Sequence, residues 1–346
     1  MNKRYSVIVL LSFFMAFSCF AAICDRDGKV LKDVVKIIRH YNPLIKLHKS
    51  TIESRYSLSS EHIDTILDEK TPFSSITLSD INAIGQVVFL RKPGLERKDI
   101  VGQENSFLPY TTEDVFSLFK SIGDIETVFP CRSIYRYILL NGSTVMSMRY
   151  RIKTLFDFIE MKKIIITPET EIVFLTGERD LFDTETEEVL MNSYPLQLKD
   201  GWEKSVSLPT TEAQAAEWIW NQAQLPNALK DIKITFVSAN KVYVSDGAGC
   251  VVQKRPTTFD TIKAWIDGHN LQSGNCLSVS NQPYVYYQQA TLYGLFKKSR
   301  LIEKGFTVDG AGMCTIHDFE SFKKQIPVIL DNFARTIYTE LNNSAV

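Results

Sequence analysis

From residue 133 onward, short apolar segments of strand length alternate with longer segments of helical periodicity. The segments of strand length are Tyr137–Leu140, Glu171–Leu175, Ile232–Val237, Cys276–Val279 and Phe306–Val308. Parallel strands joined through helices require crossover connections, and such connections build a mostly parallel sheet with helices on both faces. The alternation therefore predicts an α/β domain over residues 131–346, closed by one or more helices within Ile316–Leu341.

Residues 22–130 show a different pattern and are predicted to be mainly helical. Apolar residues recur there at helical spacing, in Val30–Tyr41, Glu61–Leu67, Ser79–Val88 and Thr111–Ile122. This region holds no recognisable catalytic constellation. Its role is left open, and covering the edge or mouth of the α/β domain is one option.

The first residues have the composition of a targeting segment. Lys3 and Arg4 precede an apolar stretch, and Cys19-Phe20-Ala21 places small residues where a cleavage site needs them. We predict a signal peptide over residues 1–21, with an uncleaved anchor and membrane association through residues 5–23 as the alternative. Either reading predicts an exported protein of the periplasm or cell envelope. In such a compartment Cys24 and Cys131 are a candidate disulfide, whereas Cys276 is predicted to be a small core residue.

Composition and missing motifs narrow the function classes. The formal net charge is -1 and no long basic run occurs, which argues against a nucleic-acid partner. The histidines are scattered and CxxC is absent from the sequence, so no metal site is predicted. The sequence has no GxGxxG and no GxxxxGK[ST]. A nicotinamide site is therefore disfavoured, a P-loop is excluded, and the cofactor, if any, is unknown.

Small and polar residues follow the predicted strands, where open α/β sheets hold their ligands. At the first strand these are Asn141 and Gly142; at the second, Thr176, Gly177, Glu178 and Arg179; at the fourth, Ser280, Asn281 and Gln282. Backbone N–H groups at the following helix starts favour an anion. The alternatives are an ordinary polar loop at Ser280–Gln282 and a mutual ion pair between Glu178 and Arg179. Ser280 is not in a GxSxG elbow and no histidine is placed for a triad, so the sequence does not favour nucleophilic hydrolysis by Ser280.

The segment from Arg255 to Thr261 opens a predicted helix with a guanidinium and several hydroxyls. Arg255, Thr257, Thr258 and Thr261 suit a phosphate or a carboxylate, because arginine can bind either through two parallel hydrogen bonds. The alternative is helix capping, with Asp260 completing a cap that Thr257 begins.

Glu212 begins another predicted helix and is the candidate catalytic residue. Its carboxylate would face the cleft as a general base or as a hydrogen-bond acceptor for a ligand. The competing interpretation is again capping, since Thr211 and Gln214 match a capping box and an acid suits the first turn of a helix. Whether the protein is an enzyme stays open at this level.

Several of these segments together resemble the ElyC/SanA/YdcF-like family of bacterial envelope proteins, a domain of unknown function. The resemblance runs from about residue 135 to residue 312. It rests on Leu140-Asn141-Gly142, Arg149 and Arg151, Leu175-Thr176-Gly177, Thr211-Glu212-Ala213, Arg255-Pro256-Thr257-Thr258 with Thr261, and Val279-Ser280-Asn281. It implies a Rossmann-like domain, a role in envelope biogenesis, and Arg149 as a further ligand-binding candidate. Asn141-Gly142-Ser143 and Gly177-Glu178 replace the family's paired glycines, and Ser280-Asn281-Gln282 replaces a loop that often carries histidine and arginine.

The leading hypothesis is an exported protein that binds a small anionic ligand, phosphorylated or nucleotide-like, at the carboxyl edge of a parallel sheet. Arg255, Thr257 and Thr258 would hold the anion, with Glu212 near the reacting or sugar-like part. A non-catalytic envelope scaffold and a hydrolase or transferase are the alternatives.

Overall fold

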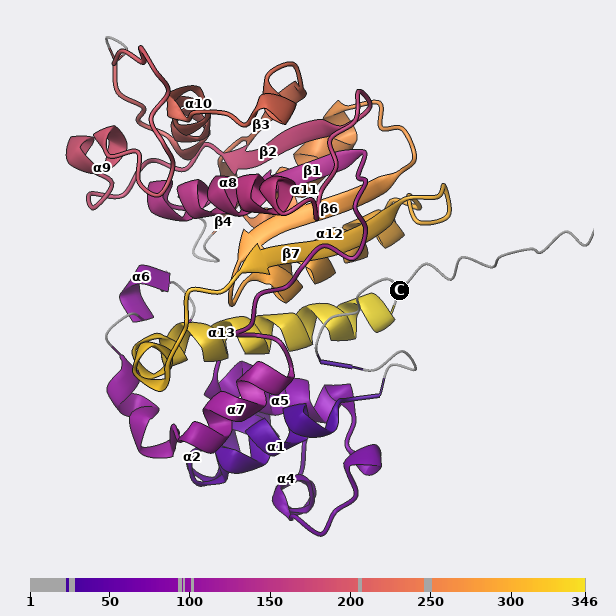
Figure 1. Cartoon of the computed structure of the whole chain (residues 1–346). Coiled ribbons are helices and arrows are strands. Elements are labelled where there is room, and N and C mark those ends of the chain that lie inside the picture. The colour runs from indigo at the N-terminus through magenta and orange to yellow at the C-terminus, as the bar shows by residue number, and fades with distance from the viewer. Residues whose placement is uncertain are drawn as a thin grey trace, which may run out of the picture.

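Figure 1 shows the computed structural model of the protein, which describes residues 23–24, 29–92, 95, 97–100, 103–204, 207–245 and 251–345. The predicted signal peptide lies outside these ranges, as does nearly all of the alternative membrane segment 5–23. None of the helices formed by the described residues is long and apolar enough to cross a membrane.

A parallel sheet forms the centre of the α/β part, as predicted. Its strands are β1 (Tyr137–Asn141), β2 (Glu171–Gly177), β3 (Lys233–Ala239), β6 (Asn275–Asn281) and β7 (Thr307–Met313). Within the described chain they form one five-stranded sheet in the order β3-β2-β1-β6-β7, and every neighbouring pair is parallel. The chain leaves β1 toward β3 and returns to the other side of β1 at β6. The β1–β6 boundary is therefore the topological switch point of a Rossmann-like sheet.

Helices cover both faces of this sheet because successive strand residues point to opposite sides. Ile138 and Leu140 pack with α8 (Val145–Glu160) and α10 (Glu212–Gln222). Tyr137 and Leu139 pack on the other face with α11 (Thr258–Gly268) and α12 (Val285–Lys298). All of β1 and β2 is buried, which explains why these strands read as nearly continuous apolar runs.

The strands run further than predicted: Asn141 belongs to β1, and Thr176 and Gly177 belong to β2. Ser280 and Asn281 belong to β6, and Gly310 and Gly312 belong to β7 instead of the loop after it. Gly312 has a packing reason, since a Cβ there would lie 2.5 Å from the Ser280 carbonyl oxygen. A short antiparallel hairpin of β4 (Val242–Ser245) and β5 (Val251–Lys254), which was not predicted, precedes α11.

The N-terminal region is helical, as predicted, and forms the lower half of Figure 1. Its α-helices are α1 (Lys32–His40), α2 (Asn42–Leu47), α3 (Lys49–Tyr56), α4 (Ser60–Leu67), α5 (Leu78–Val88), α6 (Arg97–Ile100) and α7 (Glu113–Ser121). Short 3-10 turns join them at η1 (Phe73–Ser75), η2 (Glu104–Ser106) and η3 (Leu108–Tyr110).

The last helix, α13 (Phe319–Ser344), lies between the two halves (Figure 1). Phe333, Ala334 and Ile337 belong to the same apolar core as α1, α5 and α7. On the other side, the Asn343 amide donates to the Ala290 carbonyl of α12 at 2.9 Å. The helical core is thus built from the N-terminal helices together with the C-terminal helix α13. The predicted division into residues 22–130 and 131–346 assigned α13 to the α/β domain alone.

The segment between β2 and β3 is an insertion that packs beside α8. It contains α9 (Glu187–Met191), α10 and a 3-10 turn, η4 (Asn227–Leu229). Arg149 holds it in place: its guanidinium donates to the carbonyl oxygens of Val189 at 2.6 Å and Leu190 at 2.8 Å.

Candidate functional site

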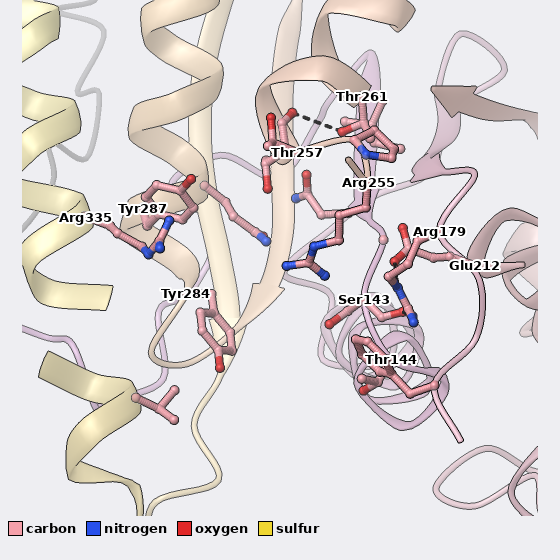
Figure 2. A pocket seen from close by; sticks show the side chains of 18 of the residues that line it. Ser143, Thr144, Arg179, Glu212, Arg255, Thr257, Thr261, Tyr284, Tyr287 and Arg335 are labelled. Atoms are coloured by element: carbon pink, nitrogen blue, oxygen red, sulfur yellow. Dashed lines mark hydrogen bonds and ion pairs between the residues drawn. The ribbon is translucent and has the colours of Figure 1, made fainter. Parts of the chain in front are cut away.

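A cavity of about 350 Å³ opens at the carboxyl ends of β1 and β2 and extends to the start of α12. Many of the predicted residues line it: Asn141, Gly142, Arg179, Glu212, Arg255, Thr257, Thr258 and Thr261. Figure 2 shows side chains from separate elements converging on one space, with Arg255 between the Tyr287–Arg335 wall and the Ser143–Arg179 wall. Segments distant in sequence therefore meet at one rim.

The cavity lies where several helices begin. Thr144, Thr257 and Tyr284 are the N-cap residues of α8, α11 and α12, and Glu212 is the first residue of α10; all of them line the cavity. Helix N-termini carry partial positive charge and present backbone N–H groups. The arrangement favours an anionic ligand.

Glu212 lies at the buried end of the cavity, with 9% of its surface exposed. Its Oε1 accepts a hydrogen bond from the Gly177 amide at 3.2 Å, and its Oε2 accepts one from Arg179 Nε at 2.9 Å. Burial raises the pKa of Glu212, against the opposing effect of Arg179. The Glu212 carboxylate lines the cavity and does not cap α10. The cap of α10 is Thr211, whose hydroxyl oxygen accepts a hydrogen bond from the Gln214 amide.

Gly142 is packed directly against this carboxylate. A Cβ at Gly142 would lie 2.0 Å from Glu212 Oε1, so only glycine leaves room for Glu212 in its observed position. Gly177 faces another part of the chain, because a Cβ there would lie 2.2 Å from Pro256 Cγ. Gly177 therefore allows Pro256 and the start of α11 to pack closely against the end of β2.

Arg179 sits between two acidic residues. Nη1 of Arg179 lies 2.8 Å from Glu185 Oε2, and Nε lies 2.9 Å from Glu212 Oε2. Glu178 is not its partner: Glu178 is exposed and accepts from the Lys241 amide at 3.4 Å. The alternative of a mutual ion pair between Glu178 and Arg179 is therefore wrong, and the charge of Arg179 is largely balanced within the protein.

The starts of α8 and α11 are capped by the protein itself. Thr144 accepts from the Ser147 amide, and Glu185 Oε1 accepts from the Val145 amide at 2.7 Å. At α11, Thr257 and Asp260 form a capping box, which confirms the capping interpretation of Asp260. The Thr257 hydroxyl donates to Asp260 Oδ2 at 2.7 Å, so this hydroxyl is already engaged.

Arg151 lies at the topological switch point between β1 and β6. It is on α8, two residues after Arg149, and points to a different side of the helix. Arg151 Nε donates to Asn281 Oδ1 at 3.0 Å, and Nη1 donates to the carbonyl oxygens of Asn141 and Gly142 at 2.5 and 2.9 Å. The Asn141 amide also donates to Ser278 Oγ at 2.9 Å. These bonds join the ends of β1 and β6.

The remaining predicted residues lie away from the cavity lining. Arg149 anchors the insertion, and the Thr176 hydroxyl donates to the Val237 carbonyl at 2.7 Å. Ser280 is 0% exposed, which removes support for a nucleophilic role. Gln282 is also buried, and its amide donates to the carbonyl oxygens of Gly123 and Glu126 at 2.6 and 2.8 Å. These side chains hold the fold around the site.

One wall comes from residues that the sequence did not single out as site candidates. Arg91 follows α5, Arg335 lies on α13, and Tyr284, Tyr287 and Gln288 come from the start of α12. Buried Asp331 accepts from Arg91 Nη1 at 3.1 Å and from Arg335 Nε at 3.0 Å. The polar stretch Ser280–Gln282 before α12 is a signal that could have identified the α12 residues. No local signal marks Arg91 and Arg335, whose positions depend on how α13 packs.

The fold and this cavity define a Rossmann-like α/β protein with a polar cavity at the carboxyl edge of its sheet. Comparison of the chain with protein-family models, curated proteins and solved structures gives no match. The residues that the structure describes contain no cluster of three or more His, Cys, Asp or Glu side chains able to hold a metal ion.

Proposed function

We propose that the protein binds a small anionic ligand, phosphorylated or nucleotide-like, in this cavity. The observation that carries the proposal is the convergence of Arg255 and Arg335 with the N-termini of α8, α10, α11 and α12 on one space of about 350 Å³. Pockets of this size hold small metabolites, and guanidinium groups bind phosphate through paired hydrogen bonds.

The two walls suit different parts of such a ligand. Arg255 extends into the middle of the cavity, where it can reach an anionic group (Figure 2). On the wall formed by Glu212, the one positive charge of Arg179 faces the two carboxylates of Glu185 and Glu212. This wall is therefore net negative and would repel an anion. Glu212 is therefore placed to accept a hydrogen bond from an uncharged, hydroxylated part of the ligand, or to act as a general base if a reaction occurs there.

We further propose that the protein is exported and acts in the cell envelope. The basic and apolar first residues support export, and so does the resemblance to ElyC/SanA/YdcF-like envelope proteins. Cys131 is disulfide-bonded, which suits an oxidising compartment. The disulfide of Cys131 does not involve Cys24, so the predicted Cys24–Cys131 pairing is wrong, while Cys276 is a buried core residue as predicted.

Isothermal titration with inorganic phosphate and a panel of phosphate esters tests the binding proposal. Wild-type protein should bind at least one ester, and Arg255→Ala should weaken that binding by about tenfold or more, because a hydrogen bond to a charged group contributes ~1.5–3 kcal/mol. Arg55→Ala, which removes an exposed arginine of α3, is the matched control and should leave the affinity unchanged. If phosphate and the whole panel leave the wild type without heat of binding, the scaffold alternative is favoured.

A Glu212→Gln variant separates binding from catalysis. If Glu212 serves a reaction, the variant should keep its affinity for the ligand and lose turnover. If Glu212 only positions Arg179 and the Gly177 loop, both variants at this position, Glu212→Gln and Glu212→Ala, should change stability and affinity together.

A further inference from the structure

The start of α12 differs from the other helix starts around the cavity. Threonine side chains cap α8, α10 and α11. The N-cap residue of α12 is Tyr284, whose side chain makes no capping bond to the helix. The first turn of α12 thus faces the cavity with the partial positive charge that an anion prefers.

A second, independent feature lies on the same turn. Gln288 lines the cavity and is only 3% exposed, yet its Oε1 has no hydrogen-bond partner among the residues that the structure describes. Side chains on a helix lean toward its N-terminus, so the Gln288 amide points back toward the start of α12. Buried polar atoms in native proteins are nearly always paired, which makes an orphan acceptor at a cavity wall a sign of an absent donor.

Arg335 adds a positively charged group to the cavity wall beside Gln288 and the first turn of α12. Its guanidinium shares the Asp331 carboxylate with Arg91, so this carboxylate faces two positive groups. Tyr287 lies beside Arg335 at the same wall of the cavity (Figure 2). The charge balance here is opposite to that at Arg179, where a single guanidinium faces two carboxylates.

We infer that the ligand is a phosphate ester that carries a hydroxyl group close to its phosphate. The phosphate binds between Arg335 and the first turn of α12, and the hydroxyl donates to Gln288 Oε1. A fully ionised phosphate ester group only accepts hydrogen bonds and leaves Gln288 unsatisfied, whereas a sugar or polyol phosphate supplies both an anion and a hydroxyl donor. This inference rests on the proposed function and assigns a role to the helical part, because α13 positions Arg335 from the helical core.

The test compares two esters of similar size by isothermal titration. Glycerol 3-phosphate has hydroxyl groups beside its phosphate ester, and propyl phosphate has none. Wild-type protein should bind glycerol 3-phosphate about tenfold more tightly than propyl phosphate, the effect of one satisfied buried acceptor. Gln288→Met should remove that preference and leave propyl phosphate within about twofold of its wild-type affinity.

A second variant locates the anion. Arg335→Met should weaken both esters by about tenfold or more and leave their ratio intact, whereas Arg55→Ala should change neither. Melting curves confirm that each variant is folded, and the wild-type ratio decides the inference even if a variant does not fold. Equal wild-type affinities for the two esters would overturn the hydroxyl assignment while leaving anion binding in place. Absence of binding for both esters and for inorganic phosphate would overturn the proposed function as well.

Discussion

Replacing Gly142 by alanine tests whether Glu212 is the fixed point around which the cavity is built. The added methyl would lie 2.0 Å from Glu212 Oε1, roughly 1.5 Å short of an ordinary contact. The Leu175 carbonyl oxygen, at 3.1 Å from the same Cβ, restricts movement of the methyl. The carboxylate must therefore shift within a buried site that also contains Arg179.

The expected loss follows from the bonds that this shift disturbs. Glu212 would lose the hydrogen bond from the Gly177 amide, which contributes ~1.5–3 kcal/mol when one partner is charged. It would also loosen the ion pair with Arg179, whose complete disruption costs ~3–5 kcal/mol. Because the ion pair is strained rather than removed, we expect Gly142→Ala to lower the free energy of unfolding by ~2–4 kcal/mol.

Urea denaturation of the purified protein measures this change as a shift in midpoint at constant slope. Gly268→Ala is the matched control, since a Cβ at the end of α11 meets nothing within 4 Å and alanine should leave stability unchanged or raise it slightly. Combining Gly142→Ala with Glu212→Asp withdraws the carboxylate by one methylene and should recover part of the loss, with a coupling energy of ~1–3 kcal/mol. Strict additivity of the two changes, or a Gly142→Ala variant as stable as the control, would refute the packing argument.

Two further perturbations follow from buried groups elsewhere. Burial raises the pKa of Asp124 to about 8, so folding favours its protonated form. The free energy of unfolding should fall between about pH 4 and pH 8, by a contribution on the order of 5 kcal/mol. Asp124→Asn should abolish this contribution in urea titrations across that range. Parallel pH profiles of the unfolding free energy for wild type and variant would argue against it. Gly312→Ala should lower the free energy of unfolding by ~3 kcal/mol or more and lower the melting temperature. Its Cβ would lie 2.5 Å from the Ser280 carbonyl oxygen and 2.6 Å from Val285 Cγ2, and neither the β6 backbone nor the start of α12 can move easily. A variant with the melting temperature of the wild type would contradict this.

Periodicity was sufficient to predict the sheet, because strands buried on both faces read as short apolar runs between amphipathic helices. The carboxyl ends of parallel strands meet at one edge. Asn141, Gly142 and Glu212 could therefore be placed together from sequence order alone. The same argument brought Thr257 to this edge, although its hydroxyl turned out to cap α11.

The errors concern side-chain direction, which strand order does not determine. Arg149 and Arg151 are two positions apart on α8, so they point to different sides of the helix. Arg151 reaches the switch point and Arg149 reaches the insertion. Ser280 and Gln282 were expected in an open loop, but β6 continues through Asn281 and both residues are buried.

The wall formed by Arg91 and Arg335 had no local signal. Its position depends on α13 crossing between the helical core and α12, a tertiary contact between residues more than two hundred positions apart in sequence, such as the pair Arg91–Asp331. The sequence likewise could not show that Gln288 Oε1 is buried without a hydrogen-bond partner among the described residues, because this depends on the surrounding packing.

The most direct measurement of the central claim is a crystal structure of the protein soaked in tungstate, a phosphate mimic whose tungsten atom is located by anomalous scattering. The account predicts a tungsten peak inside the cavity, within hydrogen-bonding reach of Arg255 or Arg335 and the first turn of α12, and loss of that peak in Arg335→Met crystals if the anion takes the inferred place. Tungsten peaks confined to other surfaces, with the cavity empty at saturating tungstate, would contradict it.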